Sequence, residues 1–238
     1  RPDEKWPGRK SGTYRWSEIQ DKTAYWRNFS NEKVISTKIS SRPTFSVDNS
    51  GSILSNTAYM IDAGSDNYFV SALLNSNLAS FLFKSIFSVK AGGFFEIQPE
   101  GLGAFPIPSA NPAQKDQVSR FARAAQLTAQ KRHSVQQAII RRIPDLAANP
   151  ASATLTTRLK EWWNLPDFAA FQKEVEKALK ARIPLQERND WENWITTSRA
   201  EIHALTAEIA RLEAEINAKV YALFDLTPDE IALLEANV

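Results

Sequence analysis

The stretch Lys33-Val34-Ile35-Ser36-Thr37-Lys38-Ile39 decides the fold of the first part of this 238-residue chain. It is rich in β-branched residues, and its apolar and polar side chains partly alternate, which predicts a strand. Two similar runs follow at residues 44–48 and 57–62, with the turn residues Asn49-Ser50-Gly51 between them. Residues 33–62 are therefore expected to form β structure.

Helical and irregular segments follow these strands. The apolar run over residues 68–87 predicts two short helices that separate near Asn75-Ser76-Asn77. The glycine pair Gly92-Gly93 then interrupts the chain, and residues 101–108 read as an edge strand closed by prolines. We expect an α+β fold class, with a mixed, β-rich head over residues 1–112.

From residue 113 onward the apolar residues repeat with a helical period. The first helix has its apolar seam at Val118, Phe121, Ala125, Thr128, Val135 and Ile139, and Pro144 ends it. A helix over residues 187–224 has a heptad pattern at Ile195, Ile202, Leu205, Ile209, Leu212, Ile216 and Leu223. A shorter amphipathic helix over residues 162–179 lies between them. Residues 113–238 are expected to form a helical stalk with a long antiparallel, coiled-coil-like helix pair.

The charges are segregated along the chain although the net charge is only +2. Residues 1–50 carry an excess of four positive charges and residues 109–160 an excess of seven, whereas residues 161–238 carry an excess of seven negative charges. This pattern fits a surface that binds a polyanion, and it fits equally well two helices of opposite charge that lie against each other. Both interpretations stay open at this point.

The composition excludes several classes of protein. The chain has no cysteine, which rules out disulfides, thiolate nucleophiles and cysteine-ligated metals, and it fits a reducing cytoplasm. No apolar run approaches the roughly 18 residues that a membrane span needs, so no membrane partner is expected. Because the chain starts at Arg1 and its single methionine is Met60, we expect it to be a fragment of a longer polypeptide.

Catalytic motifs are absent from the sequence. The two histidines, His133 and His203, fall within predicted helices without a second ligand at metal-binding spacing, and no phosphate-binding glycine loop occurs. Asp167 and Glu174 superficially suggest the carboxylates of a metal-dependent nuclease, but they fall in a helical pattern, where a solvated face is the favoured interpretation. We expect a non-catalytic chain that itself binds no metal and no cofactor.

An ordered set of segments points to a family. A Trp/Tyr-rich stretch over residues 16–26 precedes Lys33-Val34-Ile35 and the segment 43–48, Pro-Thr-Phe-Ser-Val-Asp. The remaining segments are Ala72-Leu73-Leu74-Asn75-Ser76, the pair Gly92-Gly93, residues 102–108 ending in Pro-Ile-Pro, and residues 215–231. In this order they resemble the C-terminal target recognition, or specificity, domain of type IIG restriction-modification enzymes and TaqI-like adenine-specific DNA methyltransferases.

The resemblance implies that the chain reads double-stranded DNA and positions it for a methyltransferase. The family's Asn-Pro-Pro-Tyr motif and its glycine-rich loop for S-adenosylmethionine are missing, since Ala113 follows Asn111-Pro112 and Ala151 follows Asn149-Pro150. S-adenosylmethionine, and Mg²⁺ if the enzyme also cleaves, would belong to a catalytic part of the same polypeptide. Two alternatives remain: a specificity subunit of a type I restriction system, which has a similar layout, and a helical protein-interaction scaffold.

The basic residues of the head are the candidates for DNA contact. Contacts to phosphates are predicted for Arg9, Lys10, Arg15, Lys22, Lys33, Lys38 and Arg42. Arg42, close to the short hydroxyl of Ser40, is also the preferred candidate for a bidentate contact with guanine. Lys84 and Lys90 flank Gly92-Gly93, so this loop is a candidate for contact with a DNA groove; its structural alternative is a tight connection that needs positive φ.

Aromatic residues are interleaved with arginines near the start of the chain. Tyr14, Trp16, Tyr25 and Trp26 have neighbours Arg15 and Arg27, a composition that suits stacking on unpaired bases. In a protein that reads a duplex such aromatics more often form the core, and we favour that interpretation. The four tryptophans of the helical part, Trp162, Trp163, Trp191 and Trp194, are assigned to packing within the stalk.

Overall fold

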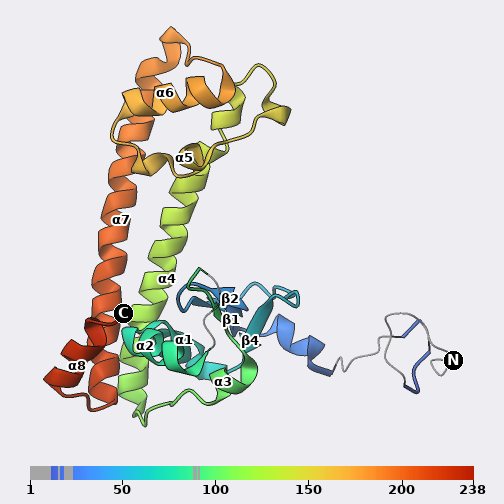
Figure 1. The fold of residues 1–238 in the computed structure, drawn as a ribbon, viewed down its shortest axis with the longest axis vertical. Helices are drawn as coiled ribbons and strands as arrows, with labels where there is room; N and C mark the ends of the chain where they lie inside the picture. The colour runs from blue at the N-terminus through green and yellow to red at the C-terminus, as the bar shows by residue number, and fades with distance from the viewer. Residues whose placement is uncertain (1–11, 16, 19–23, 88–89, 91) are drawn as a thin grey trace. The chain divides into compact units, whose positions relative to one another are not determined.

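The computed structural model describes residues 12–15, 17–18, 24–87, 90 and 92–238. The chain divides into two compact units: residues up to Asn111 together with Leu226–Val238, and Pro112–Asp225. The first unit combines antiparallel strands with short helices and the second is helical, which confirms the α+β class (Figure 1). The helical region was predicted to run to residue 238, whereas Leu226–Val238 belongs to the first unit.

A three-stranded antiparallel sheet forms the centre of the first unit. Strand β1 (Lys33–Thr37) lies between β3 (Phe45–Asp48) and β4 (Ala58–Ile61). The register sets Val34 opposite Val47 on one side. Helix α1 (Asn67–Asn75) packs on β1 and β3, and these three elements bury Val34, Phe45, Val47, Phe69 and Leu73.

The predicted break between two apolar helices is confirmed at Ser76. Its Oγ accepts a hydrogen bond from the backbone N–H of Ala79 (3.2 Å) and donates one to the carbonyl of Leu73 (2.7 Å), so one hydroxyl serves the end of α1 and the start of α2 (Asn77–Ile86). The Asn75 amide bonds both backbone groups of Phe45, accepting at 2.9 Å and donating at 2.7 Å. Asn75 thereby satisfies backbone groups on the outer side of the edge strand β3.

The remaining elements of the first unit are short. They comprise the 3₁₀ helices η1 (Ala24–Ser30) and η2 (Gly64–Asp66), the paired strands β2 (Ile39–Ser40) and β5 (Phe95–Glu96), and the helices α3 (Pro99–Gly103) and α8 (Pro228–Glu235). The edge strand predicted over residues 101–108 is wrong, because Pro99 opens a helical turn in which Leu102 N–H bonds the carbonyl of Gln98 (3.0 Å). Helix α8 starts with a capping box at Thr227 and packs on α2, with Leu234 buried.

Two long helices dominate the second unit. Helices α4 (Pro112–Ile140) and α7 (Arg188–Leu223) lie side by side (Figure 1). Lys131 pairs with Glu201 (2.9 Å), while Ile139, further along α4, packs with residues nearer the start of α7. The two helices are therefore antiparallel, as predicted. The Lys131–Glu201 pair also shows that opposite charges meet across them.

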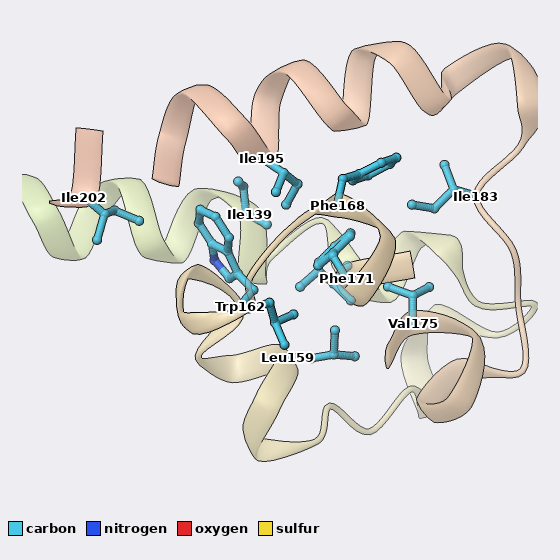
Figure 2. Close-up of a cluster of buried hydrophobic side chains, with 11 residues drawn as sticks. Ile139, Leu159, Trp162, Phe168, Phe171, Val175, Ile183, Ile195 and Ile202 are labelled. Atoms are coloured by element: carbon cyan, nitrogen blue, oxygen red, sulfur yellow. The ribbon is translucent and has the colours of Figure 1, made fainter. Parts of the chain in front are cut away.

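A hydrophobic cluster joins the long helices to the segment between them (Figure 2). This segment contains η3 (Ile143–Leu146), η4 (Pro150–Ser152), α5 (Thr157–Lys160), η5 (Trp162–Asn164), α6 (Phe168–Leu179) and η6 (Leu185–Glu187). Trp162 and Phe171 are fully buried, and the indole N–H of Trp162 donates to the carbonyl of Gln136 (3.2 Å). Trp163, Trp191 and Trp194 pack against the same cluster, which confirms their assignment to packing.

The two carboxylates considered for a nuclease have structural partners. Asp167 caps α6 by accepting from the N–H of Ala170 (2.7 Å). Glu174 is buried rather than solvated; it accepts from the hydroxyl of Thr156 (2.9 Å) and lies 3.6 Å from Arg158. Among the described residues no group of three or more His, Cys, Asp or Glu side chains is arranged to hold a metal ion.

No single described helix has the length and hydropathy of a membrane span. The bent pair Gly64–Asn75 and Asn77–Ile86 reaches these values only when its two halves are added together.

Candidate nucleic-acid interface

Strands β2 and β5 form a two-stranded antiparallel ribbon in the first unit. Ile39 faces Glu96 and Ser40 faces Phe95. The backbone of Lys38, just before β2, is fixed on both sides: its N–H donates to the carbonyl of Thr57 (2.8 Å), and its carbonyl accepts from the N–H of Ile97 (2.8 Å). We define the β2–β5 ribbon as residues 38–42, 90 and 92–96.

The glycine pair forms a tight turn at one end of this ribbon. Gly93 N–H donates to the carbonyl of Lys90 (3.1 Å), and Lys90 N–H donates to the carbonyl of Phe94 (2.7 Å). Gly92 and Gly93 have φ values of 83° and 78°, a region that glycine enters without steric cost. The pair therefore has a conformational role, and the structure also leaves both glycines exposed.

Two lysines of the ribbon meet at one carboxylate. The Nζ of Lys38 lies 3.3 Å from Oε1 of Glu96, and the Nζ of Lys90 lies 2.9 Å from Oε2. The hydrogen bond from Lys90, followed by that from Lys38, lowers the pKa of Glu96 below its ordinary value. Glu96 is therefore ionised at neutral pH and holds both ammonium groups on the ribbon.

Arg42 leaves the ribbon just after β2. The hydroxyl of Ser40 donates to the Arg42 carbonyl and lies 3.2 Å from the hydroxyl of Thr44, so Ser40 shapes the backbone there. The Arg42 side chain is exposed, and its guanidinium has no hydrogen bond or ion pair with the described residues. All its donors are available for a phosphate or for the edge of a guanine.

Lys33 does not belong to a DNA-contacting surface, which corrects the prediction. It is fully buried, and its Nζ donates to Oδ2 of Asp48 (2.6 Å) and to the carbonyl of Phe29 (2.7 Å). Burial alone raises the pKa of Asp48, but hydrogen bonds from Lys33, Ser50 and Ser52 outweigh it and hold this pKa well below its ordinary range. The ammonium of Lys33 points into the unit because Asp48, opposite it in the ladder, is its partner.

The other residues predicted to contact DNA either lie in segments of the chain outside the ribbon or fall outside the described residues. Lys84 is on α2 and donates to the backbone carbonyl of Asn237, just after α8. Arg15 is exposed and precedes η1. Arg9, Lys10 and Lys22 lie outside the described residues. The structure thus brings together Lys38, Ser40, Arg42, Lys90, Gly92 and Gly93 from the predicted set.

Two of the aromatic residues before β1, Tyr25 and Trp26, are not core residues. Tyr25 and Trp26 are 53% and 59% exposed, and the guanidinium of Arg27 lies 5.5 Å from the centre of the Trp26 ring. Trp16 lies outside the described residues. The preference for core packing is wrong for Tyr25 and Trp26, because η1 places both rings on the surface.

Three ribbon residues were missed by the sequence analysis. Phe94 and Ile39 are apolar yet 43% and 57% exposed, and Glu96 pairs with both lysines. Exposed apolar side chains on a basic ribbon suit contacts with sugars or thymine methyl groups. Their exposure could not be seen in the sequence, since isolated apolar residues in short strands usually indicate burial.

Two family models match the chain. The family model described as "TaqI-like C-terminal specificity domain" matches residues 6–107, and the model "Domain of unknown function (DUF8810)" matches residues 111–220. No curated protein and no solved structure matches the chain. Residues 6–107 are therefore similar to TaqI-like C-terminal specificity domains, and this match supports the resemblance found in the sequence. Such a domain suggests recognition of a DNA sequence in a restriction-modification enzyme and implies association with a methyltransferase part.

Proposed function

We propose that the first unit reads the target sequence of an N6-adenine DNA methyltransferase of the type IIG class, and that the β2–β5 ribbon contacts the duplex. The match to a specificity domain carries this proposal, because it covers the whole ribbon. The side chains fit a polyanion: Lys38, Arg42 and Lys90 against the single carboxylate Glu96 leave a net charge of +2. Double-stranded DNA is the partner that this charge and the family name together favour.

The ribbon residues divide into two roles. Lys38 and Lys90 are flexible point charges and suit phosphates, which fix the register without reading sequence. Arg42 presents a planar fork whose donors are free of described partners, so it suits the O6 and N7 acceptors of guanine. Phe94 and Ile39 add apolar contacts beside these cations.

The chemistry of methyl transfer belongs to another part of the enzyme in this proposal. The chain itself positions DNA, and a catalytic part of the same polypeptide supplies S-adenosylmethionine binding. Determining the coding sequence upstream of Arg1 tests whether the catalytic part belongs to the same polypeptide. A glycine-rich cofactor loop and an Asn-Pro-Pro-Tyr type motif there support it, and a reading frame without them contradicts it.

Salt-dependent binding tests the core of the proposal. The 238-residue chain is titrated against a fluorescent duplex of random sequence, and anisotropy is followed between about 50 and 200 mM salt, where counterion release weakens binding steeply. A flat response contradicts contact with phosphates. Selection from a pool of randomised duplexes then tests reading: enrichment of one sequence supports a specificity function, and an unchanged pool contradicts it.

A further inference from the structure

Glu96 faces the two lysines to which the proposed function assigns phosphate contacts. Each carboxylate oxygen serves one lysine, Oε1 at 3.3 Å from Lys38 and Oε2 at 2.9 Å from Lys90. Both ammonium groups are therefore engaged at the same time in the DNA-free protein. Lys38 directly precedes β2 and Glu96 lies in β5, so the contact between them is set by the β2–β5 pairing, whereas Lys90 reaches Glu96 from the turn before β5.

The fold does not require this carboxylate to compensate a buried charge. The side chains of Lys38 and Lys90 are 37% and 54% exposed, and that of Glu96 is 21% exposed. An ammonium in such a position is solvated by water and needs no ion pair to tolerate its environment. The pair at Lys33 differs, because that lysine is fully buried. Glu96 therefore calls for an explanation other than the stability of the fold.

Carboxylate and phosphate oxygens are chemically similar partners for lysine. Both accept short, charge-assisted hydrogen bonds from an ammonium group. A phosphate that approaches Lys38 or Lys90 has to displace Glu96 or share the ammonium with it, and the negative charge of Glu96 repels the phosphate. The ribbon thus carries less attraction for a DNA backbone than its two lysines alone would supply.

We infer that Glu96 competes with DNA phosphates for Lys38 and Lys90 and so limits the affinity that the ribbon has for DNA of arbitrary sequence. This inference rests on the proposed function of the ribbon. Binding to random DNA depends almost entirely on contacts with phosphates, so it bears the full cost of the competition. Binding to the target site bears the same cost but adds contacts with base edges, for which Arg42 is placed, so it remains the tighter of the two.

The variant Glu96→Gln tests the competition, with Glu100→Gln as its matched control. Both substitutions remove one negative charge from the first unit, but Glu100 is exposed and contacts neither lysine among the described interactions. Removing the competitor acts like one additional phosphate contact. The affinity of Glu96→Gln for a random duplex should therefore rise about threefold to tenfold at 0.1 M salt, with a salt slope steeper by about one unit. Glu100→Gln should change the affinity less than twofold, because the charge of an exposed carboxylate that pairs with neither lysine is screened by salt.

The outcomes separate the inference from the proposed function. If wild-type protein shows no salt-dependent binding to any duplex, the proposed function fails and the inference fails with it. If wild-type protein binds but Glu96→Gln binds random DNA no more tightly than Glu100→Gln, only the inference is overturned. Circular dichroism checks the fold of each variant. If Glu96→Gln does not fold, the same titration with Glu96→Ala, which also removes the carboxylate, decides the question.

Discussion

The β1–β3 ladder and the β2–β5 ribbon each contain a lysine bound to a carboxylate, but the two arrangements have opposite relations to solvent. Lys33 and Asp48 lie inside the first unit, with side chains 1% and 8% exposed, and further backbone and hydroxyl donors complete the environment of Asp48. Lys38 and Lys90 share Glu96 at the surface. The buried pair fixes η1 and β3 to β1, whereas the surface lysines are paired but accessible to solvent, so they can exchange partners.

The comparison shows why residue type alone does not identify a DNA contact. Lys33 and Lys38 are five residues apart and lie in the same β-rich segment. A buried ion pair is destabilising when one partner is removed, because the other charge stays in a low-dielectric environment. An exposed pair contributes little to stability, and its charges can exchange partners. Burial therefore separates the structural lysine from the binding lysines.

The largest expected effect follows from breaking the buried pair. Asp48→Asn leaves the ammonium of Lys33 without a compensating charge, and the free energy of unfolding should fall by about 3 to 5 kcal/mol. Urea denaturation followed by circular dichroism measures the change. Glu100→Gln is the control at an exposed carboxylate and should stay within about 0.5 kcal/mol of wild type. A loss below about 1 kcal/mol for Asp48→Asn would show that the buried pair is not a structural anchor.

The pH dependence of stability sharpens the same distinction. The folded-state pKa of Asp48 is lowered relative to the unfolded chain, so its contribution is present above the unfolded value of about 3.9 and is lost as the pH falls. We expect the urea midpoint of the wild-type protein to drop from about pH 5 downward and that of Asp48→Asn to drop less. Parallel curves for the two proteins would argue against this titration.

Arg42 should affect sequence discrimination rather than stability. Arg42→Ala removes the candidate for a guanine contact, and the difference in binding free energy between a selected duplex and a random duplex should shrink by about 1 to 3 kcal/mol. Anisotropy titrations with both duplexes give this difference. If affinity for the two duplexes falls by the same factor, Arg42 contacts a phosphate instead.

The substitution of Lys90 should have the smallest effect of these variants, and its effect should not depend on the DNA sequence. Lys90→Ala removes one phosphate contact, so affinity for every duplex should fall by about threefold to tenfold and the salt slope should become shallower by about one unit. The midpoint of urea denaturation should not move, since Lys90 is exposed. A strong loss of stability would place Lys90 with Lys33 as a structural residue.

Local patterns predicted much of the fold. The strand pattern around Val34, the break at Ser76 and the helical periods of residues 113–224 each depend on neighbours close in sequence, and the structure confirms them. Residues 101–108 were misread because two prolines suggested an edge strand, whereas Pro99 nucleates a helical turn. Burial of the Tyr25 and Trp26 rings was expected from composition, but the orientation of η1 decides it.

The site was only partly predictable for the same reason. Lys38, Arg42, Lys90 and the glycine pair were candidates because basic side chains and flexible turns are features of the sequence itself. Glu96 was missed, since its contact with Lys38 requires the pairing of β2 with β5, whose residues lie more than fifty positions apart. The inward position of Lys33 likewise follows from its register with Asp48. The sequence did not show this pairing, although Lys33 begins one segment of the family resemblance and Asp48 ends the next.

The amino-acid sequence by itself determined the α+β class, the positions of the long helices and the family of residues 6–107, because periodicity, turn residues and ordered motifs act locally along the chain. Only the tertiary structure decided which cations face solvent and which carboxylate each one meets. The energy of a charge depends on its distance from other charges and from water, and strand pairing sets those distances between residues that are far apart in sequence.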